Sequence, residues 1–262
     1  MNYEKWDEIL APYQHAVEEL KVKFKNIRKE FLTKGEYSPI EFVTGRTKKI
    51  SSIISKANRL DTNDIEGKID DIAGIRIMCQ FVEDIYTIVE LIKNRTDMTV
   101  INEKDYITNF KESGYRSYHV IIKYTVNMVD GAKDILAEFQ IRTLAMNFWA
   151  TAEHSLNYKY KQHIPEEIKI RLKKAADAAF ELDQQMLEIK DEIKDAQKLF
   201  EVKSDIISSI MNNILTLISL GKVAEAARYE VLLNRLIEEG EVWELNNLLD
   251  ITKKDLERYK DN

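Results

Sequence analysis

Three stretches of the chain alternate apolar with polar residues, which is the pattern of a β-strand with one buried face. They cover residues 71–81, 117–124 and 135–142. In each stretch one set of side chains is predicted to face a core, and the other set to share the opposite, polar face. Asp71 stands at the entry of the first stretch and Glu138 lies within the third. The alternation therefore predicts a sheet whose polar face brings acids and bases together, as a metal-dependent phosphoryl-transfer site requires.

The composition restricts the class of protein. The chain has 262 residues, of which 44% are hydrophobic and 32% charged, with only 8 Gly and 3 Pro. It is predicted to fold as one or two globular domains rich in helix. A single cysteine, Cys79, excludes a disulfide framework and favours a cytoplasmic protein in which this thiol is buried. No apolar run approaches the roughly 20 residues of a membrane helix, and the charged amino terminus lacks a secretory signal.

Positive charge is concentrated in residues 21–59, although the net charge of the chain is −6. This local excess of Lys and Arg implies an anion site. A helix is predicted over 3–33, ended by Gly35, and a second helix follows Gly45. On that second helix, spacings of four and three place four side chains along one side, namely Lys48, Ser52, Lys56 and Arg59. Such a stripe can hold a triphosphate, and a solvated basic face explains it equally well.

The rest of the first 160 residues predicts a mixed sheet covered by helices, which is an α+β or mixed α/β fold. A helix is expected near 83–94, a strand near 99–102, a hairpin turn over 126–133 with Asp130-Gly131 at the turn, and a helix from about Leu144.

A heptad seam follows, in which apolar residues recur in steps of three and four from Leu172 to Phe200. Its partner is either the first helix or a second subunit. Residues 218–225 and 237–244 are weakly similar, which favours either stacked repeats or an ordinary helical hairpin with turns near Gly221 and Gly240. The predicted domains are 1–200, with oligomerising helices at about 3–33 and 165–200, and a helical C-terminal extension at 201–262.

The glycine-rich phosphate loops of P-loop and dinucleotide-binding proteins are absent from the sequence. Nucleotide phosphates would then be held by cationic side chains and metal. Asp71 and Glu138 are oxygen ligands of the kind that suits Mg²⁺, because this ion keeps several waters and takes one or two carboxylates. The alternative is that either acid forms a structural ion pair with Arg76 or Arg142.

Four motifs resemble those of the Rel/Spo-type alarmone synthetases. They are Glu-Phe-Val-Thr-Gly-Arg at 41–46, Asp-Ile-Ala-Gly-Ile-Arg at 71–76, Gly-Tyr-Arg-Ser-Tyr-His at 114–119 and Glu-Phe-Gln-Ile-Arg-Thr at 138–143. Within that family, the segments 146–150 and 153–158 are similar to those of the small, stand-alone synthetases of the RelQ type. The resemblance runs from about Trp6 to Phe200 and implies a nucleotidyltransferase-like sheet.

The resemblance also implies a reaction. Members of the family transfer the β,γ-diphosphate of ATP to the ribose 3′-hydroxyl of GDP or GTP, with GMP as a further candidate acceptor. The products are AMP and the alarmones ppGpp or pppGpp. The long members carry a hydrolase module with a His-Asp metal site, and no His of this chain is followed by Asp. Synthesis without hydrolysis is therefore expected.

Roles for individual residues follow from the matching motifs. Asp71 and Glu138 would bind Mg²⁺, and Glu138 would also take the proton of the attacking hydroxyl. The implied ATP-binding residues are Arg46, Lys48, Ser52, Lys56, Arg59 and Arg76. Of these, Arg46 and Arg76 would sandwich the adenine between their guanidinium groups. The implied guanine-nucleotide-binding residues are Lys111, Tyr115, His119, Gln140, Asn147 and Glu153, with the tyrosine stacked on the base. Without the family, Tyr115 would be an ordinary loop aromatic and His119 a packed strand histidine.

The family further implies a homotetramer with an alarmone-binding allosteric cleft between subunits. Its residues here would be Lys25, Glu41, Phe42 and Thr44. This chain departs from its relatives by continuing to Asn262 after the long helix. Two other functions stay open. One is a toxin that pyrophosphorylates the 3′ end of tRNA, against which the acidic balance outside 21–59 counts. The other is an inert nucleotide- or RNA-binding regulator, against which the two intact acids count.

Overall fold

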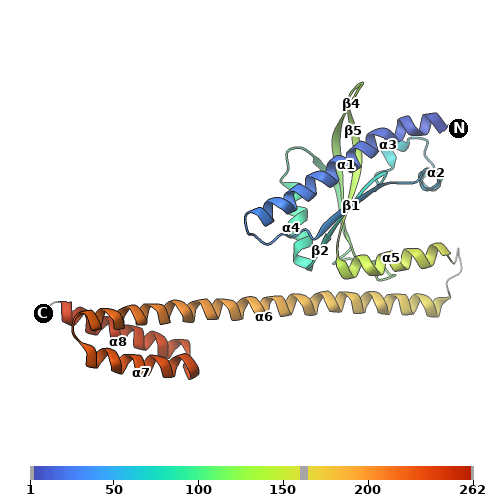
Figure 1. Cartoon of the computed structure of the whole chain (residues 1–262). Helices are drawn as coiled ribbons and strands as arrows, with labels where there is room; N and C mark the ends of the chain where they lie inside the picture. The colour runs from blue at the N-terminus through green and yellow to red at the C-terminus, as the bar shows by residue number, and fades with distance from the viewer. Residues whose placement is uncertain (1–2, 160–164, 261–262) are drawn as a thin grey trace. The chain divides into compact units, whose positions relative to one another are not determined.

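The computed structural model of the protein describes residues 3–159 and 165–260. Its elements, in chain order, are α1 (Tyr3–Thr33), β1 (Phe42–Thr47), α2 (Ile50–Arg59), α3 (Ile65–Lys68), β2 (Ala73–Cys79), α4 (Val82–Lys93), β3 (Thr99–Asp105), β4 (Tyr118–Met128), β5 (Gly131–Thr143), α5 (Leu144–Lys159), α6 (Glu166–Ser219), α7 (Val223–Glu239) and α8 (Val242–Lys260) (Figure 1). Two compact units divide after Leu187, within α6. The sequence pattern had placed the domain boundary after Phe200.

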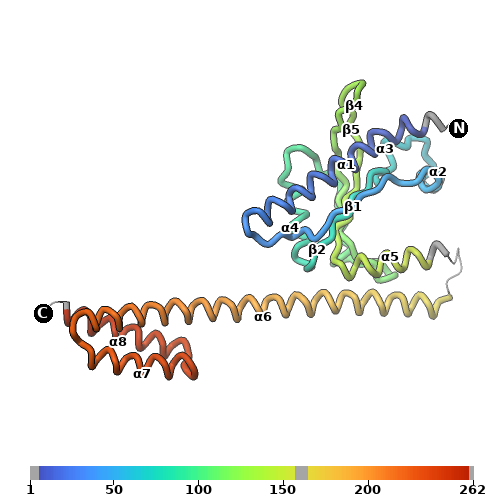
Figure 2. The backbone as a smooth tube through the Cα atoms, in the orientation of Figure 1, coloured from blue at the N-terminus to red at the C-terminus, as the bar shows by residue number. Residues whose placement is uncertain are grey.

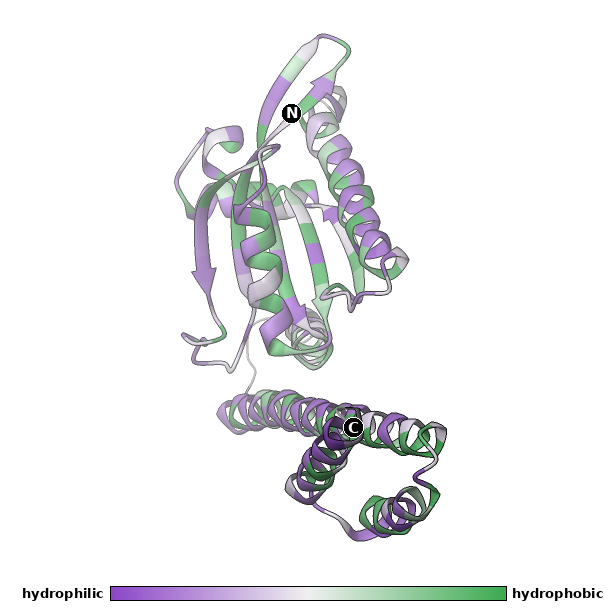
Figure 3. Ribbon diagram, turned by 90° about the vertical axis from the view of Figure 1, so that its left-hand side faces the viewer, coloured by the Kyte–Doolittle hydropathy of each residue, from purple (hydrophilic) through white to green (hydrophobic). Residues whose placement is uncertain are grey.

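A five-stranded mixed sheet forms the centre of the first unit, as predicted. Its order is β1-β2-β5-β4-β3, in which β2 and β5 are parallel and the other neighbours antiparallel. Apolar and polar residues alternate along the strands in Figure 3. Ile75, Ile77, Phe139 and Ile141 are completely buried. The register aligns Arg76 with Gln140 and Gln140 with His119, so that β2, β5 and β4 share one polar face, as expected.

Helices α1 and α4 cover the apolar face of the sheet. The trace in Figure 2 follows α1 across the strands, and Phe24 of this helix packs edge-on against Phe139, with ring centroids 4.9 Å apart. Ile85 and Ile88 of α4 belong to the same core. Cys79 is buried there as predicted, and burial raises the pKa of its thiol well above the usual value. The apolar face of the sheet therefore packs in the core, and its polar face is left open.

Two local predictions need correction. Lys48 does not lie on the second helix, because α2 begins at Ile50 and the Lys48 amide donates a 2.8 Å hydrogen bond to the carbonyl of Ile72. That bond ties Lys48 to the residues before β2, and the extended backbone of Lys49 (φ −64°, ψ 140°) separates Lys48 from the helix. The hairpin turn consists of Val129 and Asp130, since Gly131 already pairs with Met128. In addition, β3 extends three residues beyond the strand expected at 99–102.

The second unit contains the C-terminal part of α6 with α7 and α8. It has its own apolar core, which includes Ile210, Leu217, Leu233 and Leu245. The turn after α6 uses Gly221 at φ +75°, a conformation that side chains with a Cβ rarely adopt. The two weakly similar segments, 218–225 and 237–244, are the α6–α7 and α7–α8 junctions, where one helix ends and the next begins.

The heptad seam of α6 is exposed rather than covered. Ala176 and Asp183 form the buried side of the helix in the first unit, whereas Leu182 and Met186 are 55% and 45% exposed. The first helix packs on the sheet instead, so the proposal that α1 covers the seam is wrong. Along residues 3–159 and 165–260, no helix combines the length and the apolar character needed to cross a membrane.

A buried carboxyl joins α6 to the end of the sheet. Asp183 is 5% exposed and accepts a 2.6 Å hydrogen bond from Thr143 Oγ1. The same hydroxyl oxygen accepts a hydrogen bond from the amide of Met146 and thereby caps the start of α5. Burial raises the pKa of Asp183 from 3.8 to about 6, and the Thr143 bond offsets part of this effect.

We expect Asp183→Asn to stabilise the protein above pH 6. The folded state holds the Asp183 proton more tightly than the unfolded chain, so stability falls as the pH rises from about 4 to about 6 and the loss is complete above that range. Asparagine removes the ionisation, which should raise the free energy of unfolding at pH 8 by about 2 kcal/mol. Urea denaturation at pH 8 and pH 4 measures this difference, with Asp191→Asn on exposed α6 surface as control. A variant less stable than the wild type at pH 8 would contradict the assignment.

Candidate active site

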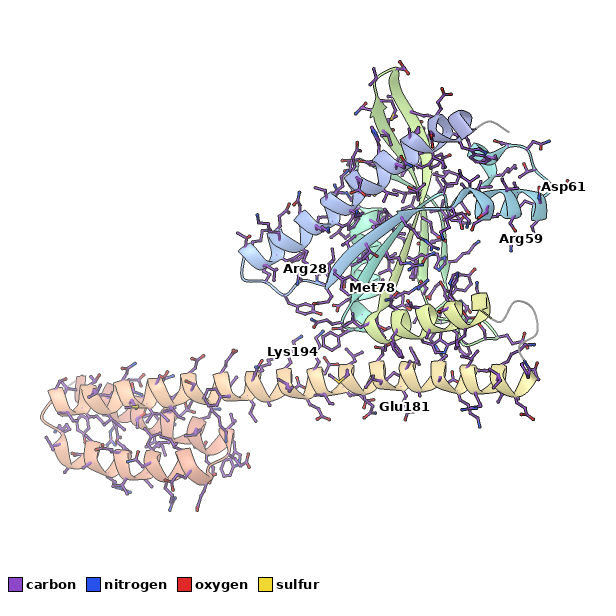
Figure 4. All side chains as sticks on the ribbon, turned by 45° about the vertical axis from the view of Figure 1, so that its right-hand side comes forward. Arg28, Arg59, Asp61, Met78, Glu181 and Lys194 are labelled. Carbon is purple, nitrogen blue, oxygen red and sulfur yellow. The ribbon has the colours of Figure 1, made fainter. Side chains whose placement is uncertain are left out.

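The polar face of the sheet is hollowed at two adjoining places. The first hollow is lined by Arg46, Lys48, Asp71, Gly74, Arg76, Glu138 and Gln140. The second is lined by Lys56, Arg59, Asp70, Asn102, Glu103, Lys104, Tyr106, Lys111, His119, Ile121 and Glu138. Arg59 stands near the C-terminal end of α2 (Figure 4). Glu138 lines both hollows, so a single carboxylate lies where two bound molecules would meet.

Asp71 is held as an anion by two lysines. It precedes β2, and Lys48 from the β1–α2 connection donates a hydrogen bond to its Oδ2. Lys56 of α2 donates to Asp71 Oδ1 at 2.9 Å and to Asp70 Oδ1 at 2.7 Å. Burial by itself would raise the pKa of Asp71, but the two lysine bonds outweigh burial and lower it. Burial likewise lowers the pKa of Lys56, and its two carboxylate partners more than restore it.

Glu138 and four other side chains form a closed ring of hydrogen bonds. Glu138 Oε1 lies 2.8 Å from His119 Nδ1, and His119 Nε2 lies 2.8 Å from the Tyr115 hydroxyl. Arg142 Nη2 donates to that hydroxyl at 2.6 Å and to Gln140 Oε1 at 3.0 Å. Gln140 Nε2 closes the ring by donating to Glu138 Oε2 at 2.7 Å. Both carboxylate oxygens are therefore fixed in direction, and an ionised Glu138 makes Nδ1 the protonated nitrogen of His119.

The partners of the two acids contradict a structural ion pair with Arg76 or Arg142. Asp71 pairs with lysines, and Glu138 with a histidine and an amide, whereas neither acid bonds to Arg76 or Arg142. Arg76 donates instead to Gln140 Oε1 at 3.3 Å. Burial lowers the pKa of Arg76, and the neighbouring charges of Arg142 and Arg46 lower it further. The face thus concentrates positive charge that a bound anion would neutralise.

Aromatic and cationic side chains cluster at the far side of Glu138. Lys111 Nζ lies 4.8 Å and 4.9 Å from the ring centroids of Tyr106 and Tyr115. The Arg142 guanidinium lies 5.1 Å from the Tyr115 centroid. Burial raises the pKa of Tyr115, so its hydroxyl stays protonated. Asn147 of α5 has a buried Oδ1 that accepts no hydrogen bond from the described residues.

The predicted residues differ in how closely they come together. Most of them line the two hollows, whereas Tyr115, Asn147 and Glu153 lie outside both lining sets and Ser52 is exposed on α2. Tyr115 adjoins the second hollow through its contact with His119. The predicted allosteric residues come from elsewhere. Phe42 and Thr44 are exposed on β1, Lys25 is exposed on α1, and Glu41 accepts a 2.8 Å hydrogen bond from Gln80 Nε2.

Sequence reasoning missed several residues of the site. Arg142 shares the polar side of β5 with Glu138 and Gln140, so the strand alternation already pointed to it. Asp70 was also missed, although it directly precedes the predicted site residue Asp71. Lys104 and Tyr106 could not be found, because the strand was expected to end at Asn102 and they follow it.

The donor set fits a divalent cation that prefers oxygen. Asp71 and Glu138 line the same hollow. Mg²⁺ binds through one or two protein carboxylates and retains several waters. Among the described residues no cluster of three or more His, Cys, Asp or Glu is placed to hold a metal. The two carboxylates therefore fit an ion that is completed by water and substrate phosphates.

Comparison with known proteins gives consistent matches. Residues 45–163 match the family described as a region found in RelA / SpoT proteins. The chain is 53% identical over 205 residues to GTP pyrophosphokinase YjbM of Bacillus subtilis, covering 78% of this chain and 97% of that protein.

Two solved structures of small alarmone synthetase 1 from Bacillus subtilis are similar to this fold. The form bound to its product pppGpp has a TM-score of 0.70 at 54% identity and covers 72% of this chain and 98% of that one. The form bound to AMPCPP has a TM-score of 0.65 at 49% identity and covers 73% and 99%. Each match leaves about a quarter of the present chain without a counterpart.

Proposed function

The chain belongs to the RelA/SpoT family, among the small alarmone synthetases, and from this premise we propose that it synthesises ppGpp and pppGpp. The 3′-hydroxyl of GDP or GTP attacks the β-phosphorus of ATP, the bond from that phosphorus to the α–β bridging oxygen breaks, and AMP leaves. The observation that carries this proposal is the position of Glu138, shared by a hollow rich in cations and a second hollow lined by aromatic and basic residues. Relatives named GTP pyrophosphokinase support the same reaction.

The first hollow suits ATP. Arg46 of β1 pairs with Gly74 of β2, and Arg76 lies two residues further along β2. The two arginines are therefore diagonal neighbours on the same face of the sheet. Such neighbours are about 7–8 Å apart, which is the space that a planar ring needs when each face contacts a guanidinium at about 3.5 Å. Positive charge for the phosphates comes from Lys48 in the first hollow and from Lys56 and Arg59 in the adjoining second hollow.

The guanine nucleotide would enter the second hollow, which Lys111 and His119 line, and extend beyond it to Tyr115 and α5. Tyr115 offers a ring for stacking once Lys111 moves from its face. The unpaired Oδ1 of Asn147 on α5 is an acceptor of the kind that the N–H groups of guanine require. Glu153 lies further along α5. His119 and Gln140 orient the Glu138 carboxylate, which in turn contacts the acceptor hydroxyl in the proposed reaction.

Glu138 is the general base of the proposed reaction. Its Oε1 and Oε2 are held by His119 and Gln140, so the carboxylate is oriented before the acceptor binds. The proton of the 3′-hydroxyl passes to this carboxylate as the oxygen attacks. Asp71 and Glu138 would hold Mg²⁺, which when bound supplies neutralisation of the charge on the transferred phosphates. The cytoplasmic location remains a prediction.

The test of the function is product analysis. The purified protein is incubated with ATP and, in turn, GMP, GDP and GTP, with Mg²⁺ or with excess EDTA, and the products are separated by anion exchange. We expect AMP and a 3′-diphosphorylated guanosine nucleotide in equal amounts, only when Mg²⁺ is present. Release of AMP without a guanosine product, or no AMP with any acceptor, would refute the proposal.

We also propose a homotetramer. The seam residues Leu182, Met186, Ile189, Ile193 and Phe200 are 45–73% exposed in the single chain. Such a row of exposed apolar side chains favours a partner helix. Light scattering in solution measures the mass, and a monomer at micromolar concentration would count against assembly.

The alarmone is proposed to bind at an allosteric site formed by Lys25, Glu41, Phe42 and Thr44. Phe42 is 41% exposed, which leaves its ring free to contact a base. We expect the double change Lys25→Ala with Phe42→Ala to abolish stimulation by added pppGpp while the basal rate is kept. Rates with and without pppGpp measure this. An equal fall of the basal rate would assign these residues a structural role.

A further inference from the structure

Arg116 is a buried cation between the acceptor site and α6. It is 7% exposed, and its guanidinium lies 4.4 Å from the ring centroids of both Phe110 and Phe180. Its Nη2 donates a 3.1 Å hydrogen bond to Asp177 Oδ1 of α6. Its Nη1 donates to the Gly114 carbonyl at 3.2 Å and reaches the Ala176 carbonyl at 3.5 Å. A planar, permanently charged group is suited to such simultaneous stacking and bonding.

The loop that carries Arg116 rests directly on α6. A tight turn joins the Gly114 amide to the Lys111 carbonyl at 2.8 Å, and Gly114 has φ +87°. A Cβ added to Gly114 would lie 2.6 Å from the Cβ of Ala176, so the loop and the helix are in close contact here. Trp149 of α5 donates a 2.8 Å hydrogen bond to the Leu172 carbonyl, which holds α5 beside the same part of α6 (Figure 1).

The loop that Arg116 holds against α6 carries side chains proposed to bind the guanine nucleotide. Tyr115 directly precedes Arg116, and Lys111 begins the turn. The Tyr115 hydroxyl then bonds to His119 and Arg142, which lead to Glu138 through the ring of hydrogen bonds. A displacement of the loop would therefore move the Tyr115 ring first and reach the Glu138 carboxylate only through His119, or through Arg142 and Gln140.

We propose that Arg116 is a positioning residue that latches the acceptor loop, residues 110–117, onto α6 and thereby fixes Tyr115 for the guanine nucleotide. This inference rests on the proposed function, because it assumes that Tyr115 contacts the guanine base. The residues proposed to bind ATP lie on β1, the β1–α2 connection, α2 and β2, and none of them belongs to the latch. Loss of the latch is thus expected to weaken acceptor binding selectively.

The experiment compares Arg116→Ala with the wild type in steady-state kinetics, varying GDP and ATP separately. The KM for GDP should rise about tenfold or more, while the KM for ATP changes less than about twofold. Calorimetric titration with GDP in the absence of ATP should show the same loss of affinity without any chemistry. Arg171→Ala, an exposed arginine of α6, is the matched control and should behave as the wild type.

A second variant tests the latch without removing the charge. Gly114→Ala introduces a methyl group against Ala176 and should give the same selective rise in the KM for GDP. Arg116→Lys should give an intermediate effect, because lysine keeps the charge but loses the planar fork. An equal rise of both KM values, or unchanged GDP affinity in folded variants, would overturn the inference. A wild type that forms no AMP would instead refute the proposed function, while the GDP titration would still decide on the latch.

Discussion

Glu138→Gln is expected to lower alarmone synthesis by about a thousandfold or more, because a general base contributes up to about 10⁴-fold and this residue would also lose its charge toward Mg²⁺. The amide has the size of the carboxylate and can accept from Gln140 while donating to His119 Nδ1, provided that the imidazole proton moves to Nε2, which faces the Tyr115 hydroxyl. The ring of hydrogen bonds around it can therefore persist. We expect the thermal midpoint and the binding of both nucleotides to stay close to those of the wild type.

Separation of AMP from ATP over a time course measures this rate. The control is Glu66→Gln, which removes a surface carboxylate paired with Lys133 at 2.9 Å and should leave the rate unchanged. A Glu138→Gln protein that is folded and retains more than about a tenth of the wild-type rate would show that another group takes the proton.

Asp71→Asn is expected to separate ATP binding from catalysis. In the wild type this carboxylate neutralises Lys48 and Lys56, and its pKa is lowered by their hydrogen bonds against the effect of burial. Removal of the negative charge frees both lysines for phosphates, so an ATP analogue should bind as tightly as before, or more tightly, when EDTA is present. Synthesis should nevertheless fall by at least about a hundredfold, because one of the two carboxylates for Mg²⁺ is lost.

Titration of the rate with Mg²⁺ measures the second effect, and we expect half-saturation to require about tenfold more of the ion. Asp134→Asn, at a surface pair with Lys123, serves as the control. If Asp71→Asn weakened ATP binding without changing the Mg²⁺ requirement, Asp71 would be a structural partner of the lysines and no metal ligand.

Much of the fold followed from local patterns. The ends of α1, the existence of α4 and α5 and the alternation along β2 and β5 were predicted, because side-chain periodicity and helix-stopping residues act over a few neighbours. The start of α2 was misplaced, since the spacing of Lys48, Ser52 and Lys56 fits a helix. The backbone of Lys49 is extended instead, and the Lys48 amide bonds to Ile72, which is distant in sequence.

The long helix shows the same limit in another form. Its heptad pattern predicted an apolar seam, and that seam exists, but in the first unit the chain buries a neighbouring side of α6 with Ala176 and Asp183. Periodicity alone cannot tell which of two adjacent stripes faces the same subunit. The polar latch at Arg116 gave no periodic signal either, because its partners Phe110 and Phe180 are 70 residues apart in the chain.

The sequence by itself determined which side chains stand on the polar face of the sheet, because successive residues of any strand point to opposite sides whatever the topology. It also determined the family, through motifs of six consecutive residues each. Only the tertiary structure decided that β2, β5 and β4 are neighbours in the register that aligns Arg76, Gln140 and His119. Closure of the ring around Glu138 and the pairing of Asp71 with two lysines depend on that register. Contacts between residues far apart in the chain are set by how the whole core packs, and no local pattern encodes them.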